Sequence, residues 1–154
     1  MAKHGWSGPS EAELRKRVGK SLGVEFGARP MRMAGGSRAD MAKIGDEAWV
    51  AVHIERKRDH PVENVLQYWP WLERNRRRLV LVHVIASDAD RRPGGRADLT
   101  AWLGAMMERV IPGRFDYCRV EIGSLEEGRQ LEAATAAIAS LKEPMEGRSL
   151  IHGA

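Results

Sequence analysis

One apolar run constrains the fold of this chain more than any other part of the sequence. Residues 79 to 85, Leu-Val-Leu-Val-His-Val-Ile, are almost continuously hydrophobic over the length of a strand. Such a run is typical of a central strand covered on both faces, as in α/β proteins. Segments with helical spacing of apolar residues precede and follow it. The sequence therefore predicts an α/β fold, with His83 as a hydrogen-bonded histidine of the core.

The other elements are predicted from their own local patterns. Ser10 and Glu13 form a capping box ahead of Leu14, Val18 and Leu22, which recur at helical spacing, so a helix begins there. The predicted elements that follow are a weak strand in 24–33, strands 37–44 and 48–57, a helix from 61 that Pro70 interrupts or kinks, the strand 79–85, a helix over 98–111, a strand over 115–122 and an alanine-rich helix through 131–141. This order predicts an α/β sandwich with a mixed central sheet flanked by helices.

Three of these helices carry finer predictions. The buried stripe of the helix from residue 61 is predicted to be Val62, Val65, Leu66 and Trp69. In the helix over 98–111 the residues at helical spacing are Leu99, Trp102, Leu103, Met106 and Val110, and Met106 and Met107 are interpreted as core filler. A second capping box, residues 124–127, is predicted to open the last helix.

The hairpin formed by 37–44 and 48–57 carries the most informative charged residues. Successive side chains of a strand point to opposite faces, so Glu55 and Lys57 project together, about 7 Å apart along the strand. Asp40 lies on the preceding strand, and we expect it to bring a second carboxylate to the same place. Two carboxylates suit Mg²⁺, which prefers oxygen ligands and keeps water and phosphate positions open. The lysine would orient the attacking water or balance developing charge.

These residues resemble the motif of the PD-(D/E)xK nuclease superfamily, with Asp40 as its first acid and Glu55-Arg56-Lys57 as its (D/E)xK element. The preceding residues 34–38, Ala-Gly-Gly-Ser-Arg, are similar to the approach to that acid in archaeal Holliday-junction resolvases. The resemblance covers roughly residues 10 to 86, and Ala39 replaces the proline of the motif. It implies a restriction-endonuclease-like αβββαβ core, here with a C-terminal β-α extension. It also implies hydrolysis of phosphodiester bonds in DNA with Mg²⁺, or Mn²⁺ in its place, held by Asp40 and Glu55.

The resemblance implies two further site residues. Glu11 lies on the apolar stripe of the first helix, where an unpaired carboxylate is costly, and it is the expected third metal ligand. The alternative is that Glu11 only interacts favourably with the helix dipole. Gln67 occupies the place of a glutamine that many superfamily members carry on the helix after the motif. The alternative for Gln67 is a polar residue that faces solvent.

The charge distribution favours nucleic acid as a partner. The net charge is +4, and residues 1 to 100 hold 19 Lys and Arg against 13 Asp and Glu, whereas residues 101 to 154 hold 6 against 8. Basic residues near the predicted site can contact phosphates without reading sequence. The expected nucleic-acid contacts are Arg15, Lys16, Lys20, Arg38 and Arg58. The alternative is a solvated, arginine-rich surface.

Length and composition set further limits. A chain of 154 residues with no internal repeat is expected to form one domain, 1–154, with flexible ends at 1–9 and 144–154. No apolar run approaches the length of a membrane span and no signal peptide is evident, so we expect a cytoplasmic protein without a membrane partner. Cys118 is the single cysteine, which excludes a cysteine metal site. A homodimer is plausible because small nucleases often cut both strands by pairing with a copy.

Three alternatives to the nuclease stay open. In the first alternative, the charged residues of the hairpin are ordinary solvated side chains. In the second, the chain is a non-catalytic module that retains the nuclease fold and binds nucleic acid or protein through its basic face or through Trp69 and Trp71. The third is acid–base hydrolysis of a small substrate, for which no nucleophile–base pair at recognisable spacing is present.

Overall fold

A computed structural model describes residues 10–27, 30–33, 38–56, 61–86 and 93–142 of the chain. The helices are α1 (Glu11–Leu22), α2 (Pro61–Leu66), α3 (Tyr68–Asn75), α4 (Arg96–Val110) and α5 (Glu127–Ser140). The strands are β1 (Met31–Arg32), β2 (Arg38–Ile44), β3 (Ala48–Glu55), β4 (Arg78–Ile85) and β5 (Phe115–Glu121). The expected ends 1–9 and 144–154 lie outside the described residues.

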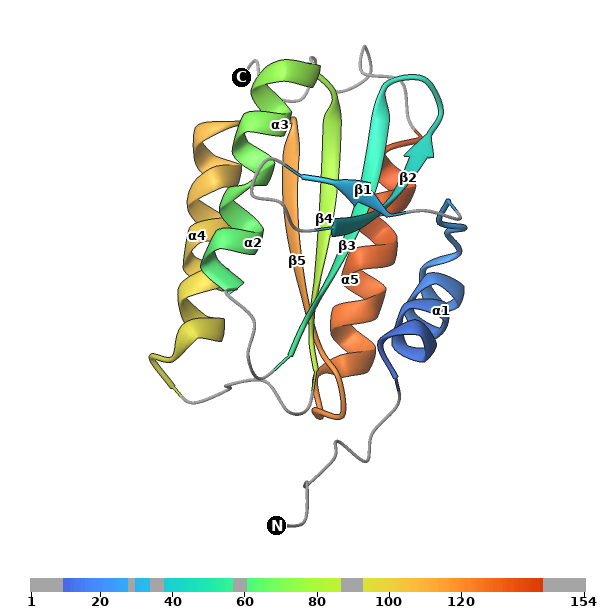
Figure 1. Ribbon diagram of the computed structural model, residues 1–154, viewed down its shortest axis with the longest axis vertical. Coiled ribbons are helices and arrows are strands. Elements are labelled where there is room, and N and C mark those ends of the chain that lie inside the picture. Colours follow the sequence, from blue (N-terminus) through green and yellow to red (C-terminus); the bar gives the residue numbers. More distant parts are fainter. Residues whose placement is uncertain (1–9, 28–29, 34–37, 57–60, 87–92, 143–154) are drawn as a thin grey trace, which may run out of the picture.

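The sheet forms the middle of three layers (Figure 1). Its strands are neighbours in chain order, β1 to β5. The pairs β1–β2 and β2–β3 are antiparallel, and the pairs β3–β4 and β4–β5 are parallel. Helices α1 and α5 cover one face, and α2, α3 and α4 cover the other. The predicted α/β class with a mixed, helix-flanked sheet is confirmed.

Each face of the sheet carries its own hydrophobic core. Under α1 and α5 the core includes residues of both helices and the even-numbered residues of β3, namely Leu14, Val18, Leu22, Val50, Val52, Ile54, Ala134 and Ile138. Under α2, α3 and α4 it includes Ala51, Val65, Tyr68, Leu72, Leu79, Leu81, Met107 and Phe115. Every residue of β4 is buried. The prediction of a central strand covered on both faces is confirmed, and its physical basis is this double core.

The start of α1 follows the predicted capping box. The backbone N–H of Ser10 donates to Glu13 Oε2 at 2.7 Å, and the N–H of Glu13 donates to Ser10 Oγ at 3.2 Å. The second predicted box, at 124–127, is wrong. Ser124 Oγ instead donates to the carbonyl of Glu121, and α5 begins only at Glu127. The weakly predicted strand in 24–33 is reduced to the two residues of β1.

Proline 70 divides the second predicted helix into α2 and α3. A proline lacks the N–H that would bond to residue i−4, and its ring clashes with that carbonyl. For Pro70 that carbonyl belongs to Leu66, the last residue of α2. The predicted stripe is partly wrong, since Val65 is fully buried but Leu66 is about half exposed. Tyr68 and Leu72 of α3 occupy the core instead.

The face of helix α4 that packs on the sheet is not the face that the spacing of its large apolar residues predicts. Its buried residues are Ala97, Thr100, Gly104 and Met107. Leu99, Trp102 and Val110 are more than half exposed, so the predicted apolar spacing does not mark the core face. A Cβ added at Gly104 would lie 2.3 Å from the ring of Tyr117, so only glycine permits this close approach of helix to sheet. None of the helices in the described ranges is long and apolar enough to cross a lipid bilayer.

Candidate functional site

Asp40 lies on the face of the sheet that α1 and α5 cover. Its partner in β3 is Val52, and residues paired across antiparallel strands project to the same face. On this face Arg15 of α1 donates a hydrogen bond to Asp40, with 3.0 Å between Nη1 and Oδ1. Burial raises the pKa of Asp40 above its ordinary value, although the Arg15 guanidinium opposes that shift. Asp40 is therefore one half of a partly buried ion pair.

Glu55 projects to the opposite face, toward α2 and α4. Its side chain is almost fully buried, at 3% exposure. Its Oε1 accepts a hydrogen bond from His83 Nε2 at 2.8 Å and another from Asn64 Nδ2 of α2 at 2.9 Å. The expectation that Asp40 and Glu55 converge on one site is therefore wrong.

The register of the hairpin explains why the two carboxylates diverge. A three-residue turn, Gly45-Asp46-Glu47, joins the strands and sets Asp40 opposite Val52. Glu55 lies three residues beyond Val52, about 10 Å along the strand, and an odd step changes the face. A shift of one residue in the register would reverse this result, and the register depends on the turn.

These positions do not fit a shared Mg²⁺ ion. Carboxylates that project from opposite faces of a sheet cannot both coordinate one ion at a bond length of about 2 Å. Within the described ranges, no group of three or more His, Cys, Asp or Glu side chains is arranged to hold a metal ion. The predicted Lys57 and Arg58 lie outside the described residues, and so do the side chains of Glu11 and Arg38.

Glu55 belongs instead to a buried polar network on the parallel strands. Because a carboxylate can only accept, Nε2 of His83 donates the hydrogen bond to Glu55, and Nδ1 of the same ring lies 2.7 Å from the hydroxyl of Tyr117. His53 pairs with His83 in register, and its Nδ1 lies 3.5 Å from the Tyr68 hydroxyl. His83 has no exposed surface, so its predicted role as a hydrogen-bonded core histidine is confirmed.

Burial sets the protonation of this network. Desolvation alone would raise the pKa of Glu55, but the hydrogen bond and charge of His83 and the hydrogen bond from Asn64 outweigh it and lower that pKa. Desolvation lowers the pKa of His53 to about 4, and it raises the pKa of Tyr68. Glu55 is therefore ionised and His53 neutral at neutral pH. Oε2 of Glu55 has no hydrogen-bond partner among the described residues.

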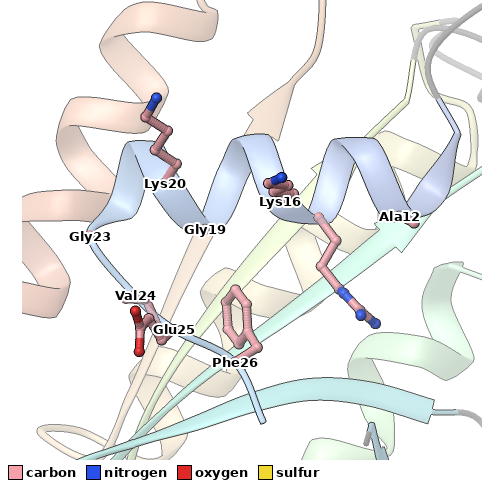
Figure 2. A pocket seen from close by; sticks show the side chains of 9 residues that line it. Ala12, Lys16, Gly19, Lys20, Gly23, Val24, Glu25 and Phe26 are labelled. Carbon is pink, nitrogen blue, oxygen red and sulfur yellow. The ribbon is translucent and has the colours of Figure 1, made fainter. Parts of the chain in front are cut away.

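Three of the predicted basic residues line a groove along α1. It has a volume of about 800 Å³, and Arg15, Lys16, Lys20 and Phe26 are among its lining residues (Figure 2). Lys16 and Lys20 are both exposed and lie one turn apart. The Phe26 ring lies beside Gly19, where an added Cβ would come within 3.2 Å of it. The absence of a side chain at Gly19 therefore lets the chain after α1 lie close against the helix.

The remaining predicted site residues have structural roles. Gln67 is buried and its Nε2 donates to the carbonyl of Asn64 at 2.8 Å, so the alternative of a solvent-facing residue is wrong. Trp69 and Trp71 are half-buried against the core under α2, α3 and α4. The Trp71 ring packs edge-on against Trp49, with centroids 6.2 Å apart. Neither tryptophan is therefore a free surface anchor.

Sequence reasoning missed most partners of Glu55. The alternation of β3 places His53 on the same face as Glu55, and this was the available signal. Asn64 and Tyr117 join the network from α2 and β5, and only tertiary packing brings them there. Comparison of the chain with protein-family models, with curated proteins and with solved structures finds no match in any of the three.

Proposed function

We propose that this chain binds the phosphate backbone of DNA along α1, and that Asp40 and Glu55 do not act together as a nuclease centre. The observation that carries the proposal is the open groove beside α1, whose lining includes Arg15, Lys16 and Lys20. The order of the elements along the chain is compatible with the αβββαβ core that the resemblance implies, which supports the proposal. The proposed protein is thus a nuclease-like domain used for binding.

The groove lining holds three basic residues and one acidic residue, Glu25, so its net positive charge suits a polyanion. Lys16 and Lys20 are exposed and project from the same side of α1. Arg15 is about one third exposed and shares its charge with Asp40, so Lys16 and Lys20 are the main free cations of the groove surface. Contacts of this kind release counterions from DNA and give a binding constant that falls steeply with salt. The half-buried Phe26 ring adds a surface on which an unpaired base can stack.

Removing the two lysines is expected to weaken DNA binding and its salt dependence together. In Lys16→Ala/Lys20→Ala, the slope of log K against log salt should fall in magnitude by about 1.8, because each lost phosphate contact contributes about 0.9 for duplex DNA. Affinity at about 0.1 M salt should drop roughly tenfold or more. Fluorescence anisotropy with labelled duplex DNA over a series of salt concentrations measures both quantities.

The matched control removes the same charge from the other face of the molecule. Lys43 and Arg74 are both exposed. Lys43 is paired in register with Trp49, which packs against the core under α2, α3 and α4, and Arg74 lies in the last turn of α3. Lys43→Ala/Arg74→Ala should leave most of the salt slope unchanged. An equal loss in both double variants would indicate a general charge effect and would contradict a binding surface on α1.

Removing the Asp40 carboxylate is not expected to change the binding of divalent metal ions. Calorimetric titration of Mg²⁺ and Mn²⁺ into wild type and Asp40→Ala should give the same result, because Glu55 lies on the other face of the sheet. The same samples are then assayed for nicking of supercoiled DNA. Metal binding that disappears in Asp40→Ala, together with metal-dependent nicking, would restore the nuclease interpretation.

A further inference from the structure

Helix α4 exposes three of its large apolar residues, and most of the residues that it buries are small. The residues turned to the sheet are Ala97, Thr100, Gly104 and Met107, of which only Met107 is large. Trp102 is 62% exposed, and Leu99 and Val110 are exposed to a similar degree. A helix on the surface of a globular domain normally shows the reverse arrangement. An outer face of this kind marks an interaction surface.

The three exposed residues and the half-buried Met106 form one stripe along the helix. With about 100° of rotation per residue, Leu99, Trp102, Met106 and Val110 fall within a narrow sector of the helix. Leu66, at the end of α2, is about half exposed, and α2 packs beside α4 on the same face of the sheet (Figure 1). The stripe is here called the α4 face.

We propose that the α4 face binds the α4 face of a second copy of this chain, with the two α4 helices antiparallel. Two exposed charges at opposite ends of the helix select this partner and orientation. Asp98 lies in the first turn and Arg109 in the last, and both are on the same side of the stripe. In antiparallel helices related by a two-fold axis, residues on the same side of the seam face one another, so Asp98 meets Arg109 of the partner.

The antiparallel arrangement agrees with two further features of α4. A two-fold axis through the centre of the helix brings the two Trp102 side chains together near the middle of the interface, which is where energetically dominant aromatic residues are found. The helix dipoles then also run in opposite directions. Asp98 Oδ1 pairs with Arg119 at 3.3 Å and Oδ2 accepts from the Gly94 N–H at 2.8 Å, and about half of the side chain stays exposed to a second cation.

Substitution of Trp102 is expected to separate the two copies. Sedimentation equilibrium over a range of protein concentrations should show a dimer for wild type, and Trp102→Glu should raise its dissociation constant at least roughly 30-fold. The matched control is Leu125→Glu, because Leu125 is fully exposed but lies outside the α4 face. Far-UV circular dichroism should show that both variants are folded.

Cysteine cross-linking tests the orientation. In a Cys118→Ala background, Leu99→Cys and Val110→Cys proteins should form a disulfide when mixed but little when each is oxidised alone, and both variants keep Asp98 and Arg109. Parallel helices would give the opposite pattern and would overturn the antiparallel proposal. A wild type that is monomeric at every concentration, or a dimer that Leu125→Glu disrupts as much as Trp102→Glu, would overturn the dimer itself. The DNA-binding measurements on α1 are separate from these results, since α1 covers the other face of the sheet.

Discussion

Replacing His83 with alanine is expected to lower the free energy of unfolding by about 3–5 kcal/mol. His83 has no exposed surface, and it donates the 2.8 Å hydrogen bond to the nearly fully buried Glu55. Its loss leaves a buried carboxylate with Asn64 as its remaining described donor, removes the His83 partner of the Tyr117 hydroxyl, and creates a cavity. Urea denaturation at neutral pH, followed by circular dichroism, measures the change.

A double-mutant cycle separates the hydrogen bond from the cavity. Glu55→Met/His83→Leu removes both polar partners and keeps most of the volume, so its cost should be clearly smaller than the sum of the two single substitutions. A His83→Ala protein that loses less than about 1 kcal/mol, or a cycle in which the single effects add, would show that Glu55 and His83 are not strongly coupled.

The stability of the protein is expected to fall by about 3 kcal/mol as the pH decreases from 6.5 to about 4, because of His53 alone. Burial lowers the pKa of His53 from 6.5 to about 4 in the folded protein. Between these values the unfolded chain binds a proton at His53 that the folded protein does not bind. The contribution of His53 to the free energy of unfolding is therefore fully present above pH 6.5, and it decreases as the pH falls toward 4. Urea denaturation at a series of pH values follows this loss.

Of the neighbours of His53, Glu55 acts in the same direction and Tyr68 lies outside this range. Glu55 has a lowered pKa in the folded protein, so its contribution is lost only below its unfolded value of 4.5. The pKa of Tyr68 is raised from 10.0, far above the range. In His53→Gln the decrease between pH 6.5 and 4.5 should largely disappear. A variant that loses stability as steeply as wild type would assign the effect to other groups.

Whether Asp40 and Glu55 share a face of the sheet depends on the pairing register of β2 and β3. The strand alternation correctly placed Val50, Val52 and Ile54 on one face and His53 and Glu55 on the other. It did not establish which residue of β3 faces Asp40, because the three-residue turn determines that pairing. The carboxylates therefore meet different partners, Arg15 for Asp40 and His83 for Glu55.

Helix α4 shows a second limit of periodicity. The spacing of its residues predicted a helix, and a helix forms from Arg96 to Val110. Because this helix is apolar on several sides, the spacing alone does not determine which side is buried. Gly104 decides it by allowing the backbone to approach the ring of Tyr117. A glycine within a helix is a weak signal until the residue that it contacts is known.

Local physical chemistry in the sequence determined the elements of this protein. Hydrogen bonds between Ser10 and Glu13 begin α1, the missing N–H of Pro70 separates α2 from α3, and the apolar residues of β4 require cover on both faces. Tertiary structure decided the pairing of Asp40 with Arg15, the network of Glu55 and the buried face of α4. The physical reason is that periodicity fixes which residues share a side of one element, whereas register and packing depend on contacts between segments far apart in the chain.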